Sequence, residues 1–196
     1  MTNPLDLTQD LTFKYLFSQC PEELSAFLDS VLHQSTRSLE LVSGIRSGSM
    51  SYQKAIEMDL CATFREGCLV NVEMQRRRNR SDLLQRWIYY ASQLLMSQEL
   101  KGKEYEQIRP VYVIVLADYC EFSDEAYEHR FTYRTWTGQP LIGGQKELTN
   151  IILLELPKMK KEDPSEMNEC EMWMYYLKNH HRKPKRRNHP RNHEKK

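Results

Sequence analysis

The chain has 196 residues, with 28 Lys and Arg against 27 Asp and Glu, and this length suits one domain with a sizeable core. It contains no run of about 18 apolar residues, and its start has no basic segment followed by an apolar one, so neither a transmembrane helix nor a secretory signal is predicted. The five cysteines are an odd number without a C-x-x-C pair, which argues against a disulfide scaffold or a zinc site and for a reducing, cytoplasmic setting.

Two helices and a strand are predicted before residue 43. Residues 10–17 have apolar side chains at helical spacing and predict a short helix, for which Asp10 would be the N-cap. Residues 18–33 predict a second helix with Pro21 in its first turn. Its buried stripe is expected to comprise Leu24, Phe27, Leu28, Val31 and Leu32. Residues 39–42 predict a strand.

Residues 55–64 and 68–75 predict a β-hairpin, because apolar and β-branched residues flank a turn that contains Gly67. A three-residue loop with Gly67 in the left-handed region would pair Phe64 with Cys68. A two-residue turn would shift the register by one residue and move every side chain of one strand to the other face.

The three-residue loop would place Asp59 directly opposite Glu73, on one face of the sheet, and Gln75 would share that face. The other face would carry core residues, namely Met58, Leu60, Val72 and Met74. The alternative is that both carboxylates merely face solvent. However, Asp is disfavoured within strands, and opposed like charges are unfavourable unless a cation lies between them. Two carboxylates and an amide on one face therefore predict a site for a hard divalent cation.

The second half of the chain predicts a long helix, three strands and a last helix. The long helix would run from about Ser81 to Gly102, with an apolar stripe of Leu84, Trp87, Ile88, Ala91, Leu94 and Leu95 and a separate face of Arg86, Tyr90 and Gln93. Strands are expected at 111–116 (buried and central), 131–136 (half-exposed) and 148–156, and a helix at 165–179 with Cys170, Trp173, Met174 and Leu177 on one side. This order predicts an α/β architecture with a mixed central sheet flanked by helices.

Residues 180–196, here called the basic tail, carry eight Lys or Arg and one Glu, a net charge of +7, whereas the remainder has a net charge of −6. Apart from two prolines the tail contains no apolar residue, which predicts disorder. We therefore expect a domain at 1–179 and a separate tail. The asymmetry favours a polyanionic partner, and the tail's histidines do not indicate a metal site.

Basic residues also follow directly after the strand that contains Glu73. The run comprises Arg76, Arg77, Arg78 and Arg80, which form either a solvated loop or a phosphate-binding element. Arg86 and Tyr90 lie one turn apart on the next helix and are either an ordinary exposed pair or ligands of phosphate and water in the same cleft.

An ordered set of motifs spans residues 8–179. It comprises DLTFKYLF at 10–17, EMDL at 57–60, NVEMQ at 71–75, RWIYY at 86–90, KGKEY at 101–105, LELPK at 154–158 and Trp173. In this set the chain resembles the Rpn-type recombination-promoting nucleases and transposases of the PD-(D/E)XK phosphodiesterase superfamily.

The resemblance implies a PD-(D/E)XK (restriction-endonuclease-like) core and metal-dependent DNA endonuclease activity in recombination or on mobile DNA, with Mg²⁺ or alternatively Mn²⁺. Asp59 matches the family's metal-binding Asp, Glu73 the acid of its second motif, and Asp10 the acid of its first, which would support a second metal ion. Gln75 stands where the superfamily most often has a catalytic Lys. The other DNA contacts would be the arginines named above and Tyr90.

Two departures motivate alternatives. The first is that Gln75 carries no positive charge. The second is that family members usually continue with helical sequence after the Trp173 region, whereas this chain has the basic tail there, as expected of a truncated or frameshifted copy. The chain would then be a DNA-binding or interaction module that keeps the fold without cleavage. A third hypothesis, after the endonuclease and the module without cleavage, is a toxin-like nuclease directed at the host chromosome. The sequence leaves target sequence, metal number and assembly as a homo-oligomer open, and predicts no membrane association.

Overall fold

The computed structural model describes residues 10–36, 38–42, 60–64, 67–76, 82–98, 100, 102, 104–141 and 147–179, without the side chains of residues 10 and 11. The helices are α1 (Asp10–Gln19), α2 (Pro21–Leu32), α3 (Leu83–Met96) and α4 (Glu169–Asn179). The strands are β1 (Glu40–Leu41), β2 (Leu60–Phe64), β3 (Cys68–Gln75), β4 (Val111–Ala117), β5 (Glu128–Phe131) and β6 (Thr149–Glu155). Three short 3-10 turns, η1 (Tyr105–Gln107), η2 (Leu156–Lys158) and η3 (Pro164–Glu166), lie between them.

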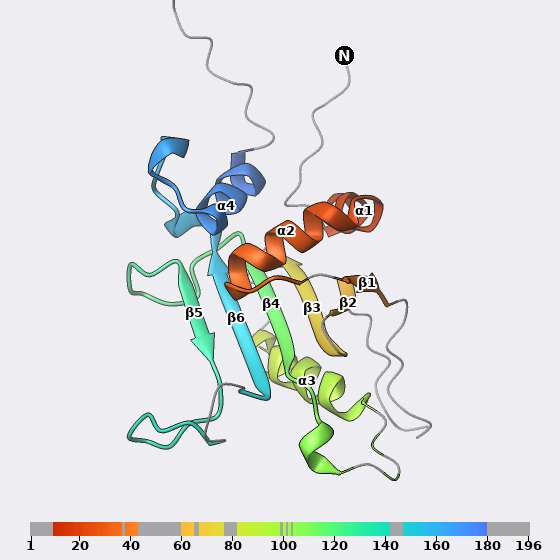
Figure 1. Ribbon diagram of the computed structural model, residues 1–196. Coiled ribbons are helices and arrows are strands. Elements are labelled where there is room, and N and C mark those ends of the chain that lie inside the picture. The colour runs from red at the N-terminus through yellow and green to blue at the C-terminus, as the bar shows by residue number, and fades with distance from the viewer. Residues whose placement is uncertain are drawn as a thin grey trace, which may run out of the picture.

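The described strands form one mixed sheet in the order β1-β2-β3-β4-β6-β5 (Figure 1). Strands β3, β4 and β6 run parallel at its centre, and β1, β2 and β5 pair antiparallel with their neighbours. The parallel strands are buried on both faces, which explains their nearly continuous apolar sequences. The predicted α/β class and mixed sheet are therefore confirmed.

The register of the β2–β3 hairpin is the one that a three-residue loop predicts. Phe64 pairs with Cys68, and the pairing continues residue by residue to Leu60 with Val72. Gly67 has a φ of +92°, in the left-handed region that glycine occupies at little cost. Asp59, one residue before β2, lies outside the described residues, so its place opposite Glu73 stays a prediction.

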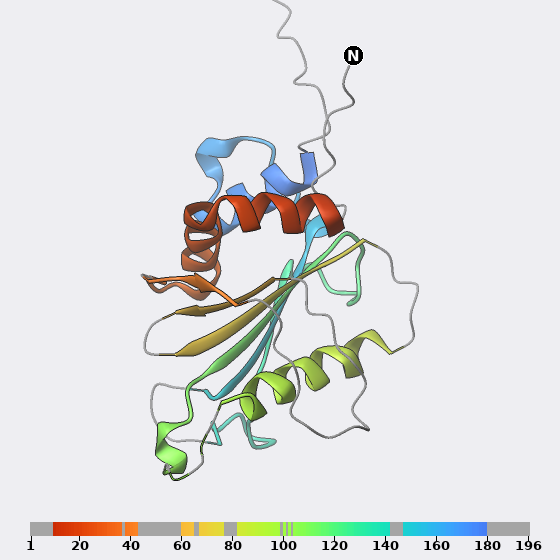
Figure 2. The same cartoon turned by 90° about the vertical axis from the view of Figure 1, so that its right-hand side faces the viewer.

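Helices cover both faces of the sheet, with α3 on one face and α1, α2 and α4 on the other (Figure 2). Successive strand residues point to opposite faces, so each strand supplies both cores. Val72, Ile114 and Ile152 pack with the three-helix layer, whereas Val113, Val115 and Leu153 pack with α3. No helix among the described residues has the length and apolarity to cross a membrane.

The rotation and length of α3 differ from the prediction. Leu84 and Ile88, expected in the buried stripe, are exposed, whereas Tyr90 and Gln93 are buried beside Trp87. The helix turns this way because Arg86 reaches a buried carboxylate of the sheet. It also ends at Met96 rather than near Gly102, because the side-chain amide of Gln98 bonds both the N–H and the carbonyl of Arg109 and redirects the chain toward β4.

Three further boundaries were wrong. Ser18 belongs to α1, and α2 begins only at Pro21. The half-exposed strand is Glu128–Phe131 rather than 131–136, and its pairing with β6 stops at Phe131, opposite Ile151, although β6 itself begins at Thr149. Residues 132–141 instead form a hydrogen-bonded turn that leaves Trp136 fully exposed.

The last helix starts at Glu169 rather than Ser165. Asp163 caps η3 by accepting from the Ser165 N–H, and Asn168 then starts a new helix. The Asn168 side chain accepts from the Glu171 N–H at 2.9 Å, and the Glu171 carboxylate accepts from the Asn168 N–H at 2.9 Å. This reciprocal capping box fixes the start of α4.

Candidate active site

Glu73 lies near the end of β3, on the face of the sheet that α3 covers. Its side chain is fully buried. A buried carboxylate is costly unless other groups neutralise it or donate hydrogen bonds to it, so its contacts show how the sequence accommodates it.

Three side chains hold the Glu73 carboxylate. Asn71 Nδ2 donates to Oε1 at 2.8 Å, while Gln75 Nε2 and an Arg86 terminal nitrogen each donate to Oε2 at 3.4 Å. Asn71 and Gln75 flank Glu73 at two-residue spacing on the same strand, and Arg86 reaches it from the first turns of α3. The carboxylate is thus fixed from within its own strand and from the covering helix.

Arg86 also contacts Tyr90, one turn later on α3. The guanidinium carbon lies 5.3 Å from the centre of the Tyr90 ring, within the range of a cation–π contact. The Arg86 side chain is 22% exposed, and its buried Nε forms no hydrogen bond within the described part of the chain. Arg86 therefore has donor capacity beyond its ion pair with Glu73.

The structure leaves several predicted site residues unplaced. Asp59, Arg77, Arg78 and Arg80 lie outside the described residues. Arg76 is exposed directly after β3. Asp10 begins α1, a helix on the opposite face of the sheet from Glu73, but its side chain is not described.

Asn71 is the residue of this site that the sequence analysis missed. It is fully buried in the middle of β3, and its Oδ1 accepts from the Cys61 thiol of β2 at 3.6 Å. A signal was available, because Asn is disfavoured within strands, as Asp is. Asn71, a polar residue inside a run of β-compatible residues, stands out for the same reason as Asp59.

The described side chains suit a hard cation by type but do not suffice by number. No three His, Cys, Asp or Glu side chains among the described residues are grouped to hold a metal ion. Glu73 and its two amide neighbours offer oxygen ligands, which Mg²⁺ prefers. A second carboxylate, such as that of Asp59, is what this set requires.

A second polar cluster lies on the same face and at the same end of the sheet. Gln75 pairs with Ala117, and Ala117 pairs with Glu155, so these residues form one row across β3, β4 and β6. Adjacent strands are about 4.8 Å apart, which puts Glu155 about 10 Å from Gln75. Glu155 is fully buried, and the sequence analysis gave it no role.

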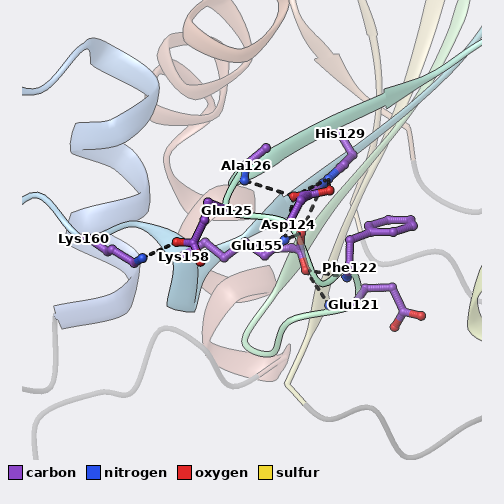
Figure 3. Close-up of polar contacts among 9 residues, drawn as sticks. All are labelled: Glu121, Phe122, Asp124, Glu125, Ala126, His129, Glu155, Lys158 and Lys160. Carbon is purple, nitrogen blue, oxygen red and sulfur yellow. Dashed lines mark hydrogen bonds and ion pairs between the residues drawn. The ribbon is translucent and has the colours of Figure 1, made fainter.

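Figure 3 shows how the carboxylate of Glu155 is satisfied. It accepts from Lys158 Nζ at 2.7 Å, from the Phe122 N–H at 3.1 Å and from the Glu121 N–H. His129 Nδ1 lies 3.1 Å from the same carboxylate. Glu155 thus anchors the segment that follows β4 to the end of β6.

Asp124 closes the cluster on its solvent side, 3.0 Å from His129 Nε2 and 3.2 Å from Lys158 Nζ. The hydrogen bond from His129 is the main reason that the pKa of Asp124 lies below its ordinary value. Burial disfavours the charged form of Lys158, but hydrogen bonds to Glu155 and Asp124 outweigh it and raise the pKa of Lys158.

The sheet order and helix placement define an α/β fold of the PD-(D/E)XK nuclease type. The chain belongs to the PD-(D/E)XK nuclease family transposases, whose sequence profile matches residues 7–195. This match confirms the resemblance and continues beyond residue 179, through most of the basic tail. No curated protein and no solved structure matches the chain significantly.

Proposed function

We propose that this protein is a metal-dependent DNA endonuclease that hydrolyses phosphodiester bonds in recombination or on mobile DNA. The observation that carries the proposal is the buried Glu73 carboxylate, held by Asn71, Gln75 and Arg86 at the end of a central strand. Family membership supports a nuclease or transposase role and DNA as the substrate.

Asp59 and Glu73 would hold the metal ion, Mg²⁺ or Mn²⁺, and Asp10 would contribute to a second one. The hairpin register supports this pairing, because the next pair after Leu60 with Val72 on this strand would be Asp59 with Glu73 on the α3 face. When bound, a divalent ion lowers the pKa of a coordinated water and neutralises charge on the phosphate.

Gln75 and Arg86 would act on the water and on the phosphate. The Gln75 amide can orient the attacking water but supplies no charge. Arg86 supplies the charge: its contact with Glu73 is 3.4 Å, longer than the usual 2.7–2.9 Å of a charge-assisted bond. If the Arg86 guanidinium turned toward a phosphate, the protein would therefore lose only a weak contact with Glu73.

The DNA phosphates would be bound, where the chain leaves β3, by Arg76, Arg77, Arg78 and Arg80. Tyr90 would hold the Arg86 guanidinium in place through its cation–π contact. Contacts of this kind position DNA without reading its sequence. They predict binding that weakens as salt concentration rises.

The test is nicking of supercoiled plasmid by the wild type and by Asp59→Ala, with Mg²⁺, with Mn²⁺ and with chelator. We expect metal-dependent nicking that the substitution abolishes. Glu106→Ala is the matched control, because Glu106 is an exposed carboxylate on η1. Unchanged Mg²⁺-dependent nicking by Asp59→Ala would remove the assignment.

A DNA-binding module without cleavage is the second candidate function. Two observations favour it: Gln75 has no charge, and Glu73 already accepts from three donors. In that case a well-folded wild type binds DNA equally with metal and with chelator and does not nick. The same assay, run alongside a binding measurement, separates the two functions.

A further inference from the structure

A groove of about 780 Å³ runs between α2 and α4, on the layer of helices opposite the candidate active site. Figure 1 shows these two helices side by side. Trp173 lines the groove and is fixed by Phe17 and Phe27, with ring centres 6.0 Å away in each case. Met172 and Tyr176, both more than 40% exposed, continue this apolar wall along α4.

The groove is acidic. Its described lining includes three carboxylates, Glu23, Asp29 and Glu169, and no Lys, Arg or His. Asp29 accepts from the Thr36 N–H at 2.5 Å, whereas Glu23 and Glu169 form no ion pair with a described residue. Carboxylates above an aromatic and methionine wall suit Lys and Arg, whose stems pack on apolar surface while their charged ends meet carboxylates and ring faces.

The basic tail has the matching chemistry and begins beside the groove. It follows α4 at Asn179, three residues after Tyr176, and has a net charge of +7. From Asn179 back to Glu169 is about 15 Å along the helix axis. An extended chain covers that distance in about five residues. A tail that turned back along α4 would therefore bring residues 182–187, five of them Lys or Arg, within reach of the acidic rim.

We propose that the basic tail of this chain binds the α2–α4 groove of the same chain. Attachment keeps the tail at a high effective concentration near the groove, so weak exposed ion pairs suffice to hold it. A tail held there is withdrawn from DNA, and DNA phosphates compete with Glu23 and Glu169 for the same Lys and Arg side chains. The proposal does not depend on nuclease activity.

Zero-length carbodiimide crosslinking of the full chain tests the location directly, since it joins amines only to carboxylates in contact. We expect Lys183 or Lys185 to be joined to Glu23 or Glu169 within one chain, with a yield that does not depend on protein concentration. Crosslinks between chains, or crosslinks spread equally over Glu104 and other exposed carboxylates, would overturn the proposal.

Limited trypsin digestion tests the electrostatics, because the tail offers many cleavage sites that docking would protect. The variant Glu23→Gln with Glu169→Gln should raise the rate of tail cleavage about threefold to fivefold, as expected for losing two exposed ion pairs. The control variant Glu104→Gln with Glu106→Gln changes the net charge by the same amount at two exposed positions, one in η1 and one directly before it. It should leave the rate of tail cleavage unchanged. Equal rates in the two variants would refute docking.

Discussion

Replacing Lys158 with Met should destabilise the protein strongly, although the two side chains have similar length. Lys158 is buried, with only 6% of its side chain exposed, and its ammonium bonds Glu155, which is fully buried. Removing one partner of a buried pair costs about 3–5 kcal/mol, because the other charge is left uncompensated. Backbone N–H groups and His129 still contact Glu155, so we expect the lower end, about 3 kcal/mol.

For a chain of this size, about 3 kcal/mol lowers the melting temperature by roughly 6–12 °C. The matched control is Lys160→Met, because Lys160 pairs with Glu125 but both side chains are more than 70% exposed. Exposed pairs contribute about 0–1 kcal/mol, so the control should melt within about 4 °C of the wild type. Urea unfolding and thermal melting at neutral pH measure both variants.

Equal melting temperatures for Lys158→Met and Lys160→Met would refute this reasoning. A double variant gives an independent check. Adding Glu155→Gln to Lys158→Met removes the uncompensated charge and should recover part of the lost stability.

Four further outcomes follow from single sites. Gly67→Ala should cost about 1 kcal/mol of stability, measured by urea unfolding, because φ at this position is +92°. An added Cβ would approach Arg109 only to 3.9 Å, so the cost comes from the backbone conformation and not from a clash. Asn168→Ala removes the cap of α4 and should cost about 1 kcal/mol in the same assay. The pKa of Asp124 is lower in the folded protein than its value near 4 in the unfolded chain, so the ionised carboxylate stabilises the fold above about pH 4 and this contribution is lost as the pH falls below that value. Asp124→Asn should therefore flatten the decline of stability between about pH 5 and pH 3. Asn71→Leu should reduce nicking and raise the Mg²⁺ concentration needed for half-maximal rate, because it removes the donor to Glu73 Oε1; an unchanged metal requirement would contradict this.

The hairpin could be predicted because its determinants are local. Gly67 supplies the left-handed residue, and the alternation of apolar side chains specifies which faces meet the cores. These two signals were enough to pair Phe64 with Cys68 and to bring Gln75 next to Glu73.

The strand β5 could not be predicted in the same way. Its residues are mostly polar, and they form a strand because distant partners hold them. His129 lies between Asp124 and Glu155, and Arg130 donates to the Val31 carbonyl at 2.5 Å, 99 positions away in the chain. Residues 132–136, which continue the more apolar alternation, have other partners: Thr132 and Arg134 donate to Glu147, and backbone hydrogen bonds between residues 133 and 141 close a turn.

The rotation of α3 shows the same limit within the candidate site. Hydrophobic periodicity favoured Leu84 and Ile88 on the buried face, yet the ion pair between Arg86 and Glu73 directs Tyr90 inward. A polar contact between helix and sheet outweighed the apolar pattern, and it could be foreseen only by placing Glu73 first.

The three tryptophans lie in three different parts of the molecule, so their intrinsic fluorescence can report on each part separately. Trp87 is buried between α3 and the sheet, Trp173 lines the α2–α4 groove, and Trp136 is fully exposed at the tip of a turn. An aqueous quencher should extinguish Trp136 emission first and reach Trp87 only on unfolding. Single-tryptophan variants would therefore follow the solvent-exposed turn, the groove and the α3 core as separate spectroscopic signals.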